Sequence, residues 1–84
     1  MLTIKEDKSI GLNELLGRRV TFFGAVYIYT GDLVALDKTF AKLENAAIVY
    51  ETGAFNEKEW KDAQSLPHPV LIRLSSVESV MVLK

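Results

Sequence analysis

The sequence predicts a single, mainly β domain, and three observations point to this class. The chain has 84 residues, enough for one small domain (1–84) and no more. Segments rich in β-branched and aromatic residues, which favour strands, fill most of the chain after residue 19. Helical signals are confined to two short stretches, one near the N-terminus and one in the middle. We therefore expect five strands and two short helices.

The first helix is expected near the N-terminus. Ser9 is a suitable N-cap, and Gly17 is a suitable left-handed end. Three leucines between them would form the apolar stripe of about two helical turns. Residues 1–8 are rich in charge, and we expect them to be flexible.

Residues 20–37 are dominated by β-branched and aromatic residues and read as strand, but eighteen residues are too many for one ordinary strand, so a turn must lie inside the segment. The turn can fall at Gly24-Ala25 or at Thr30-Gly31-Asp32. A glycine beside an aspartate is a common hairpin signal and favours the second site. The family resemblance described below favours the first, with Gly31 permitting a bend inside the second strand. We place the turn at Gly24-Ala25.

Three further strands are expected, at residues 46–51, 70–74 and 77–83. Residues 80–83 are apolar at every position, so this last strand lacks the alternation of a half-exposed strand. An uncovered apolar strand at a sheet edge promotes aggregation. The last strand must therefore be covered, either by its own domain or by a neighbouring subunit.

A polar insert, residues 52–69, separates the third and fourth expected strands. Asn56 and Glu59 have the spacing of a capping box, which predicts a small helix over about residues 57–64. Trp60 would pack this helix onto the sheet, with exposed stacking on a base as the alternative. His68 lies between two prolines and is expected to be a loop residue.

The composition narrows the functional classes. Hydrophobic residues make up 49% of the chain, although a domain of this size buries only about 60% of its unfolded surface, so self-association is favoured. The absence of cysteine excludes disulfides and thiolate metal sites. No run of about 18 apolar residues predicts a membrane span, and the early charges do not fit a secretory signal. We expect a cytoplasmic protein.

Charge gives weaker guidance. Ten basic and eleven acidic residues leave a net charge of −1, whereas nucleic-acid-binding domains usually carry a basic excess. An assembly could still concentrate a few cations from each subunit in one place. No phosphate-binding glycine loop, catalytic triad or paired carboxylate is visible, so we expect a protein without catalysis, cofactor or metal.

A first motif resembles that of the Sm/LSm (Sm-like) family. Gly31, Leu33 and Asp37 have the family's spacing of strand-bend glycine, leucine and closing aspartate. The family then has a Met-Asn pair, but the following segment is one residue shorter here. Phe40 stands at the place of the methionine and Ala41 at that of the asparagine. The asparagine normally reads a base edge, so the resemblance implies reduced base specificity.

A second motif fits the family more closely. Residues 72–77, Ile-Arg-Leu-Ser-Ser-Val, are similar to the family pattern of Ile-Arg-Gly, a small polar pair and Val or Ile. Leu74 replaces the glycine, and Arg73 matches the arginine that contacts the base. The Tyr-Lys-His motif of the bacterial branch is absent, so the chain looks closer to the archaeal and eukaryotic type.

The resemblance implies an architecture. It predicts a short N-terminal helix followed by a five-stranded, strongly bent antiparallel sheet, which forms a small SH3-like barrel. The helix of the insert would lie between the third and fourth strands. Sm-like subunits assemble through their last two strands, which implies a homo-oligomeric ring of roughly five to seven subunits. The expected interface residues are Val70, Ile72, Val80 and Val82.

The resemblance also implies a function. Sm-like rings bind single-stranded RNA, and more rarely DNA, at loops around the pore, and they serve RNA processing or turnover. The residues expected to contact nucleic acid here are Lys38, Thr39, Phe40, Arg73, Ser75 and Ser76. Other interpretations remain open: Phe40 as a core residue, and Arg73 as a structural ion-pair partner of Asp37. At the level of the protein, the alternatives are an adaptor ring that binds only proteins and a monomeric SH3-like barrel.

Overall fold

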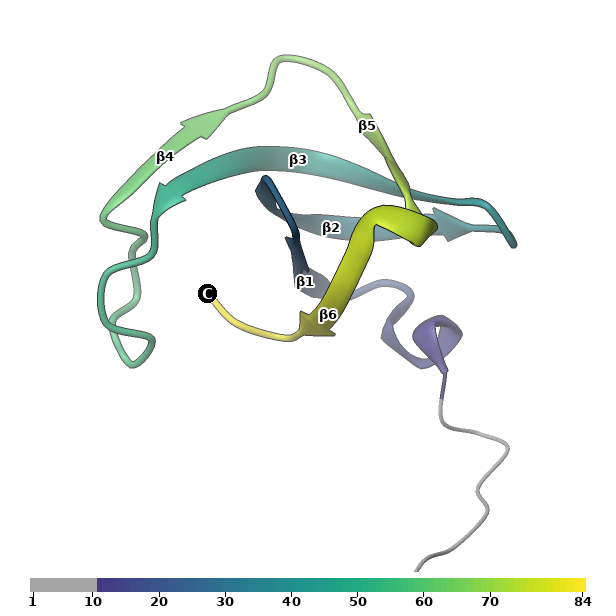
Figure 1. Ribbon diagram of the computed structural model, residues 1–84, viewed down its shortest axis with the longest axis horizontal. Helices are drawn as coiled ribbons and strands as arrows, with labels where there is room; N and C mark the ends of the chain where they lie inside the picture. The colour runs from purple at the N-terminus through teal and green to yellow at the C-terminus, as the bar shows by residue number, and fades with distance from the viewer. Residues whose placement is uncertain (1–10) are drawn as a thin grey trace, which may run out of the picture.

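A single, strongly curved antiparallel sheet dominates the computed structural model, which describes residues 11–84 (Figure 1). Its strands are β1 (Arg19–Gly24), β2 (Ile28–Leu36), β3 (Phe40–Glu51), β4 (Asp62–Ser65), β5 (Val70–Arg73) and β6 (Val77–Met81). The strand order is β4-β3-β2-β1-β6, and β5 pairs with β3. Within residues 11–84, β5 and β6 do not pair with each other, so the barrel is not closed. The mainly β class is confirmed, with six strands in place of the expected five.

The first helical element differs from the expected two-turn helix. It is a single 3₁₀ turn, η1 (Leu12–Leu15), and the proposed cap Ser9 and residues 1–8 lie outside the described residues. Gly17 does have a left-handed backbone, with φ of 84°, as predicted. Its N–H donates to the carbonyl of Leu33 at 2.8 Å, which ties the chain to β2 directly after the turn. Short helices are marginal on their own, and here the tertiary bond determines the conformation.

The hairpin turn lies at residues 25–27, which confirms the turn at Gly24-Ala25. Gly31 lies inside β2, where the β2–β3 register shifts between Thr30 and Asp32. A Cβ atom at Gly31 would lie 3.1 Å from the Cα of Ala46, so the absence of a side chain allows β2 and β3 to approach closely at the bend.

The predicted helix over residues 57–64 is wrong. Residues 62–65 instead form β4, in register with β3 at Ala47↔Ser65 and Ile48↔Gln64. β3 begins at Phe40, six residues earlier than expected, and it offers β4 a long edge for backbone pairing. A two-turn helix held mainly by its cap competes poorly with such pairing. We call residues 52–61, which connect β3 to β4, the arm loop.

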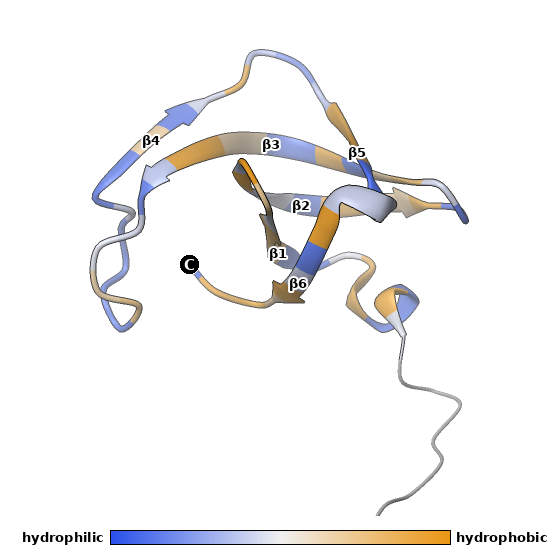
Figure 2. Ribbon diagram, in the orientation of Figure 1, coloured by the Kyte–Doolittle hydropathy of each residue, from blue (hydrophilic) through white to orange (hydrophobic). Residues whose placement is uncertain are grey.

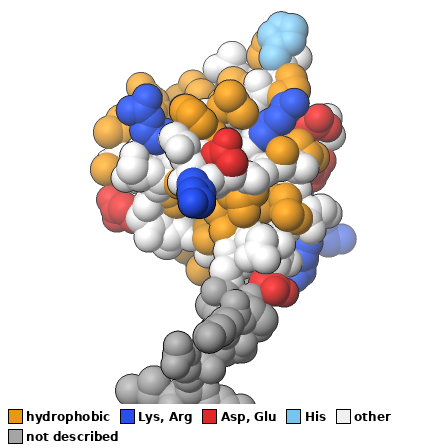
Figure 3. All heavy atoms as spheres, turned by 90° about the vertical axis from the view of Figure 1, so that its right-hand side faces the viewer, with side chains coloured by type: hydrophobic (Ala, Val, Ile, Leu, Met, Phe, Trp, Pro, Cys, Tyr) orange, Lys and Arg blue, Asp and Glu red, His pale blue; other side chains and the backbone are white. Residues whose placement is uncertain are grey.

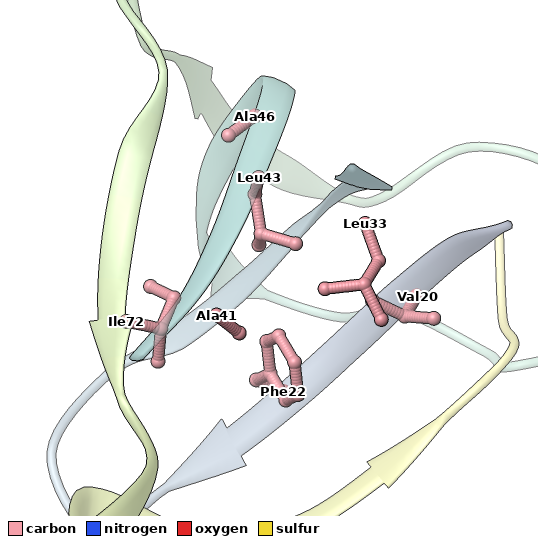
Figure 4. Close-up of a cluster of buried hydrophobic side chains, with 7 residues drawn as sticks. All are labelled: Val20, Phe22, Leu33, Ala41, Leu43, Ala46 and Ile72. Atoms are coloured by element: carbon pink, nitrogen blue, oxygen red, sulfur yellow. The ribbon is translucent and has the colours of Figure 1, made fainter. Parts of the chain in front are cut away.

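The core lies inside the curve of the sheet. Its buried residues come from β1, β2, β3 and β5, and they are Val20, Phe22, Leu33, Ala41, Leu43, Ala46 and Ile72 (Figure 4). Full burial of a large apolar side chain such as Phe22 contributes roughly 1.5–3 kcal/mol. The half-buried Leu12 and Leu15 of η1 pack against this cluster, so the 3₁₀ turn covers part of the core.

The opposite face of the sheet is also covered. Thr21 and Thr30 are fully buried there, and their hydroxyl groups hydrogen-bond at 3.2 Å. The apolar tail after β6 runs between β1 and the arm loop (Figures 1 and 2). The tail ends at Lys84, whose Nζ atom donates to the carbonyls of Thr52 (2.8 Å) and Ala54 (2.7 Å). The tail and the arm loop thus hold each other in place.

Trp60 lies in the arm loop, beside the tail, and not in a helix. It is half-buried, and the Lys84 ammonium lies 4.8 Å from the centre of its ring. Phe55 contacts Phe23 of β1 edge to face, with ring centres 6.4 Å apart. The aromatic residues of the insert therefore join the arm loop to the sheet and the tail.

Candidate nucleic-acid interface

The two loops that carry the sequence motifs lie side by side. The turn between β2 and β3, residues 37–39, meets the 3₁₀ turn η2 (Leu74–Ser76), which connects β5 to β6. The N–H of Leu74 donates to the carbonyl of Thr39 at 2.9 Å. Phe40 and Arg73 are direct partners in the β3–β5 register. Segments more than thirty residues apart in the sequence thus form one edge of the molecule, at the right of Figure 1.

Asp37 shapes the first of these loops. One oxygen of its carboxylate accepts hydrogen bonds from the N–H groups of Phe40 and Thr39, each at 2.7 Å. These bonds favour the ionised form and lower the pKa of Asp37 below its ordinary value. Among residues 11–84 the ion pairs are Arg19–Asp32 and Lys61–Glu51, so Asp37 does not bridge to Arg73. The Asp37 carboxylate thus fixes the turn, and the Arg73 guanidinium is not neutralised by it.

The predicted contact residues of the β2–β3 turn differ in exposure. Lys38 and Thr39 are exposed at its tip. Phe40 is the first residue of β3; it is half-buried and does not belong to the core cluster. Part of its ring therefore remains accessible beside the Arg73 strand.

On the other side of the contact, Arg73, Ser75 and Ser76 are all exposed. The Ser76 hydroxyl donates to the carbonyl of Arg73 at 2.8 Å and so helps to hold the 3₁₀ turn closed. The Ser75 hydroxyl lies on the surface of the same turn. This loop therefore presents a cation and hydroxyl groups at the edge where the β2–β3 turn presents Lys38 and Phe40.

A groove of about 430 Å³ opens beside Arg73. It lies between the β1–β2 turn on one side and β5, η2 and the start of β6 on the other. Its exposed lining includes Val26, Tyr27, Leu71, Arg73, Ser75 and Ser76. Lys38, Thr39 and Phe40 are not part of this lining, so the six predicted contact residues divide between the groove and the adjacent loop edge.

Sequence reasoning missed Val26, Tyr27 and Leu71. Their apolar character is typical of strand and core residues, yet the structure exposes 80% of Val26, 54% of Tyr27 and 60% of Leu71. The one available signal was the position of Val26 and Tyr27 directly after the predicted turn at Gly24-Ala25, where apolar residues often remain exposed.

The predicted interface residues also lie in different environments. Ile72 is only 5% exposed and belongs to the core, so its side chain is not available to a neighbour. Val70 and Val80 are half-buried against the core, whereas Val82 is 41% exposed. In the described part of the chain, β5 pairs only with β3 and β6 only with β1, which leaves one edge of each strand open.

Charges are mixed on the face shown in Figure 3, which is the right-hand side of Figure 1. Basic, acidic and apolar side chains alternate there without forming one continuous basic patch. Of residues 11–84, no three His, Asp or Glu side chains gather as a metal site would require. The helical turns of the same region include none with the length and apolar character to cross a membrane.

Comparisons of the chain with protein-family models, with curated proteins and with solved structures give no match. The interpretation of its function therefore rests on the two sequence motifs and on the geometry of the loops that carry them.

Proposed function

We propose that this chain binds single-stranded RNA without catalysis, as one subunit of a homo-oligomeric Sm-like ring. The observation that carries the proposal is the backbone hydrogen bond of 2.9 Å between Leu74 and Thr39. It joins the loops of the two motifs, which the family resemblance predicts to face the same ligand.

The side chains at this edge suit sequence-tolerant binding. Arg73 is exposed and offers a planar, permanently charged group for phosphates and base faces. Lys38 adds a second exposed cation, and Phe40 adds part of an aromatic ring. Base stacking contributes roughly 1–3 kcal/mol per base with little sequence preference. Ala41, which stands at the place of the family's base-reading asparagine, is fully buried, so no side chain reads a base edge there.

Assembly into a ring is supported by the open edges of β5 and β6. Unpaired strand edges are natural sites for pairing with another chain. If the β5 edge of one subunit pairs with the β6 edge of the next, both edges are satisfied, and such head-to-tail contacts form a ring when the rotation between subunits closes. The net charge of −1 gives a single subunit little attraction for RNA, and a ring would bring several copies of Arg73 and Lys38 together.

An adaptor ring that binds only proteins is the second candidate. It is favoured by the mixture of charges in Figure 3 and by the exposed apolar side chains of Val26 and Leu71. Exposed apolar groups of this kind commonly mark protein contacts.

Fluorescence anisotropy of a labelled oligouridine, at low and at physiological salt, tests the proposal. We expect saturable binding that weakens as salt rises, because bound cations release counterions from the phosphates. Arg73→Gln and Lys38→Gln should each weaken binding about tenfold, or more where several subunits contribute. Lys58→Gln, at an exposed lysine of the arm loop, is the matched control and should bind as the wild type does. Absence of binding at tens of micromolar in low salt would refute RNA binding and favour the adaptor ring.

A further inference from the structure

The groove beside Arg73 has a definite shape and lining that the motifs do not explain. It lies where the barrel is open, between the β1–β2 turn and β5, which are not paired with each other. We propose that this groove binds one unstacked base of the bound strand, with the ring of Tyr27 as its stacking surface and Arg73 at its phosphate. This inference rests on the proposed RNA binding and adds a base subsite outside the two motifs.

The walls of the groove are apolar and exposed. Val26 and Tyr27 of the β1–β2 turn and Leu71 of β5 line it, and all three are exposed. The Tyr27 ring lies 6.2 Å from the ring of Tyr29 at a tilt of 55°, so one neighbour limits its freedom while about half of its surface remains open. A partly fixed aromatic ring loses little entropy when a base stacks on it.

The hairpin wall is held against η2 at a short distance. A Cβ atom at Gly24 would lie 2.9 Å from the carbonyl oxygen of Ser76 and 3.0 Å from that of Tyr27. The turn is also closed by the bond from the Gly24 N–H to the Tyr27 carbonyl at 3.0 Å. The groove is therefore formed before any ligand binds, which reduces the cost of binding.

The polar residues of the groove suggest where the phosphate and the base of a nucleotide would lie. Arg73 supplies a cation and Ser75 an exposed hydroxyl group, both suited to a phosphate or a ribose. Glu78 also lines the groove. A carboxylate at this place would repel phosphate and would accept a hydrogen bond from an N–H group of a base. The phosphate is therefore expected at Arg73 and the base deeper in the groove.

The size of the groove favours a base over a protein segment. Its volume of about 430 Å³ lies at the lower end of the roughly 300–1,000 Å³ typical of small-molecule sites. A planar group between apolar walls fills such a space, whereas a docked helix or strand requires a longer surface.

Three tyrosine variants test the subsite. Tyr27→Leu removes the aromatic ring but keeps an apolar side chain, and Tyr50→Leu is the matched control. Tyr50 is 56% exposed, lies on β3 and does not line the groove. In the anisotropy titration we expect Tyr27→Leu to weaken oligouridine binding roughly five- to tenfold, Tyr27→Phe to retain binding, and Tyr50→Leu to leave it unchanged. In addition, an oligouridine carrying 5-iodouracil should photocrosslink to Tyr27.

The outcomes separate the two proposals. If the wild type binds no oligonucleotide, RNA binding fails and the base subsite fails with it. If the wild type binds and Arg73→Gln weakens binding, but Tyr27→Leu equals Tyr50→Leu and no crosslink reaches Tyr27, the subsite alone is overturned. If Tyr27→Leu changes the oligomeric mass and leaves RNA affinity intact, the groove is a contact between protein chains and the subsite is again overturned.

Discussion

At the residue scale, Asp37 shows how one side chain can fix the conformation of a loop. Its carboxylate accepts hydrogen bonds from the N–H groups of Phe40 and Thr39. Without it, these two N–H groups would need water as their hydrogen-bond partner. The same bonds lower the pKa of Asp37 in the folded protein. A lowered pKa means that the ionised carboxylate stabilises the fold above the unfolded pKa, and that this stabilisation is lost as pH falls through the folded pKa.

Asp37→Asn should therefore lower stability at neutral pH and have little effect in acid. We expect its urea midpoint to lie below that of the wild type at pH 7, and the difference to shrink as pH is lowered to about 2.5. Asp62→Asn, at an exposed aspartate of β4, provides the control for a general change of charge. A difference between Asp37→Asn and the wild type that persists unchanged into acid would show that the hydrogen bonds do not depend on the ionised carboxylate.

The buried threonine pair gives a second prediction at this scale. Thr21 and Thr30 are fully buried, and Thr30 Oγ1 also lies 3.1 Å from the carbonyl of Val20. Thr30→Val removes one hydroxyl and leaves the other without its partner, which should cost roughly 1–3 kcal/mol. The double variant with Thr21→Val should cost clearly less than the sum of the two single variants. Urea unfolding of all four proteins measures this coupling, and strict additivity would contradict it.

At the element scale, the arm loop depends on the tail. Lys84 makes the two hydrogen bonds to the arm-loop carbonyls and the contact with Trp60, and all three end on the same ammonium group. Lys84→Met keeps the aliphatic stem and removes the charge, and we expect a loss of about 1 kcal/mol in stability. Hydrogen exchange over residues 52–61 should become faster, and Trp60 fluorescence should change.

Lys58→Met is the matched control for this prediction, because Lys58 lies exposed on the same arm loop. It should leave both the exchange rates and the fluorescence as they are in the wild type. Equal exchange rates in Lys84→Met and the wild type would mean that the aromatic contacts, such as that of Phe55 with Phe23, are sufficient to hold the arm loop.

The elements also show what a sequence can predict. The strands at residues 20–24, 46–51 and 70–73 follow from local composition, and the structure confirms strands there. The capping signal at Asn56 predicts a helix that does not form, because β4 pairs with an edge of β3 that is not evident from the sequence. The groove could not be predicted from the sequence either, since Tyr27 and Leu71 come to line the same groove only through the curvature of the sheet. Arg73 and Ser75, which also line the groove, lie two residues apart in one motif and were therefore open to sequence reasoning.

At the scale of the whole molecule, the sheet curves far enough to enclose a core but leaves the edges of β5 and β6 unpaired in the described part of the chain. Apolar side chains lie exposed near these edges, on Leu71 of β5 and on Val82 just after β6. A chain with open edges and surplus apolar surface gains stability when it associates with a second copy. Assembly would also bring several copies of Arg73 together, one from each subunit, so we expect oligomeric state and RNA affinity to change together.

Two valine variants test this connection. Val82→Asp places a charge next to the β6 edge, whereas Val34→Asp places the same charge on β2 at almost the same exposure, 42% against 41%. By light scattering after size exclusion, we expect a multimer for the wild type and for Val34→Asp, and a shift towards the mass of one chain for Val82→Asp. Circular dichroism should show the same β content in all three. The dissociated variant should also bind oligouridine more weakly and with a shallower salt dependence, because fewer cations act together. A wild type that is monomeric at micromolar concentration would exclude the ring and leave a monomer with an open, curved sheet, whose RNA affinity would have to come from one copy of Arg73, Lys38 and the groove.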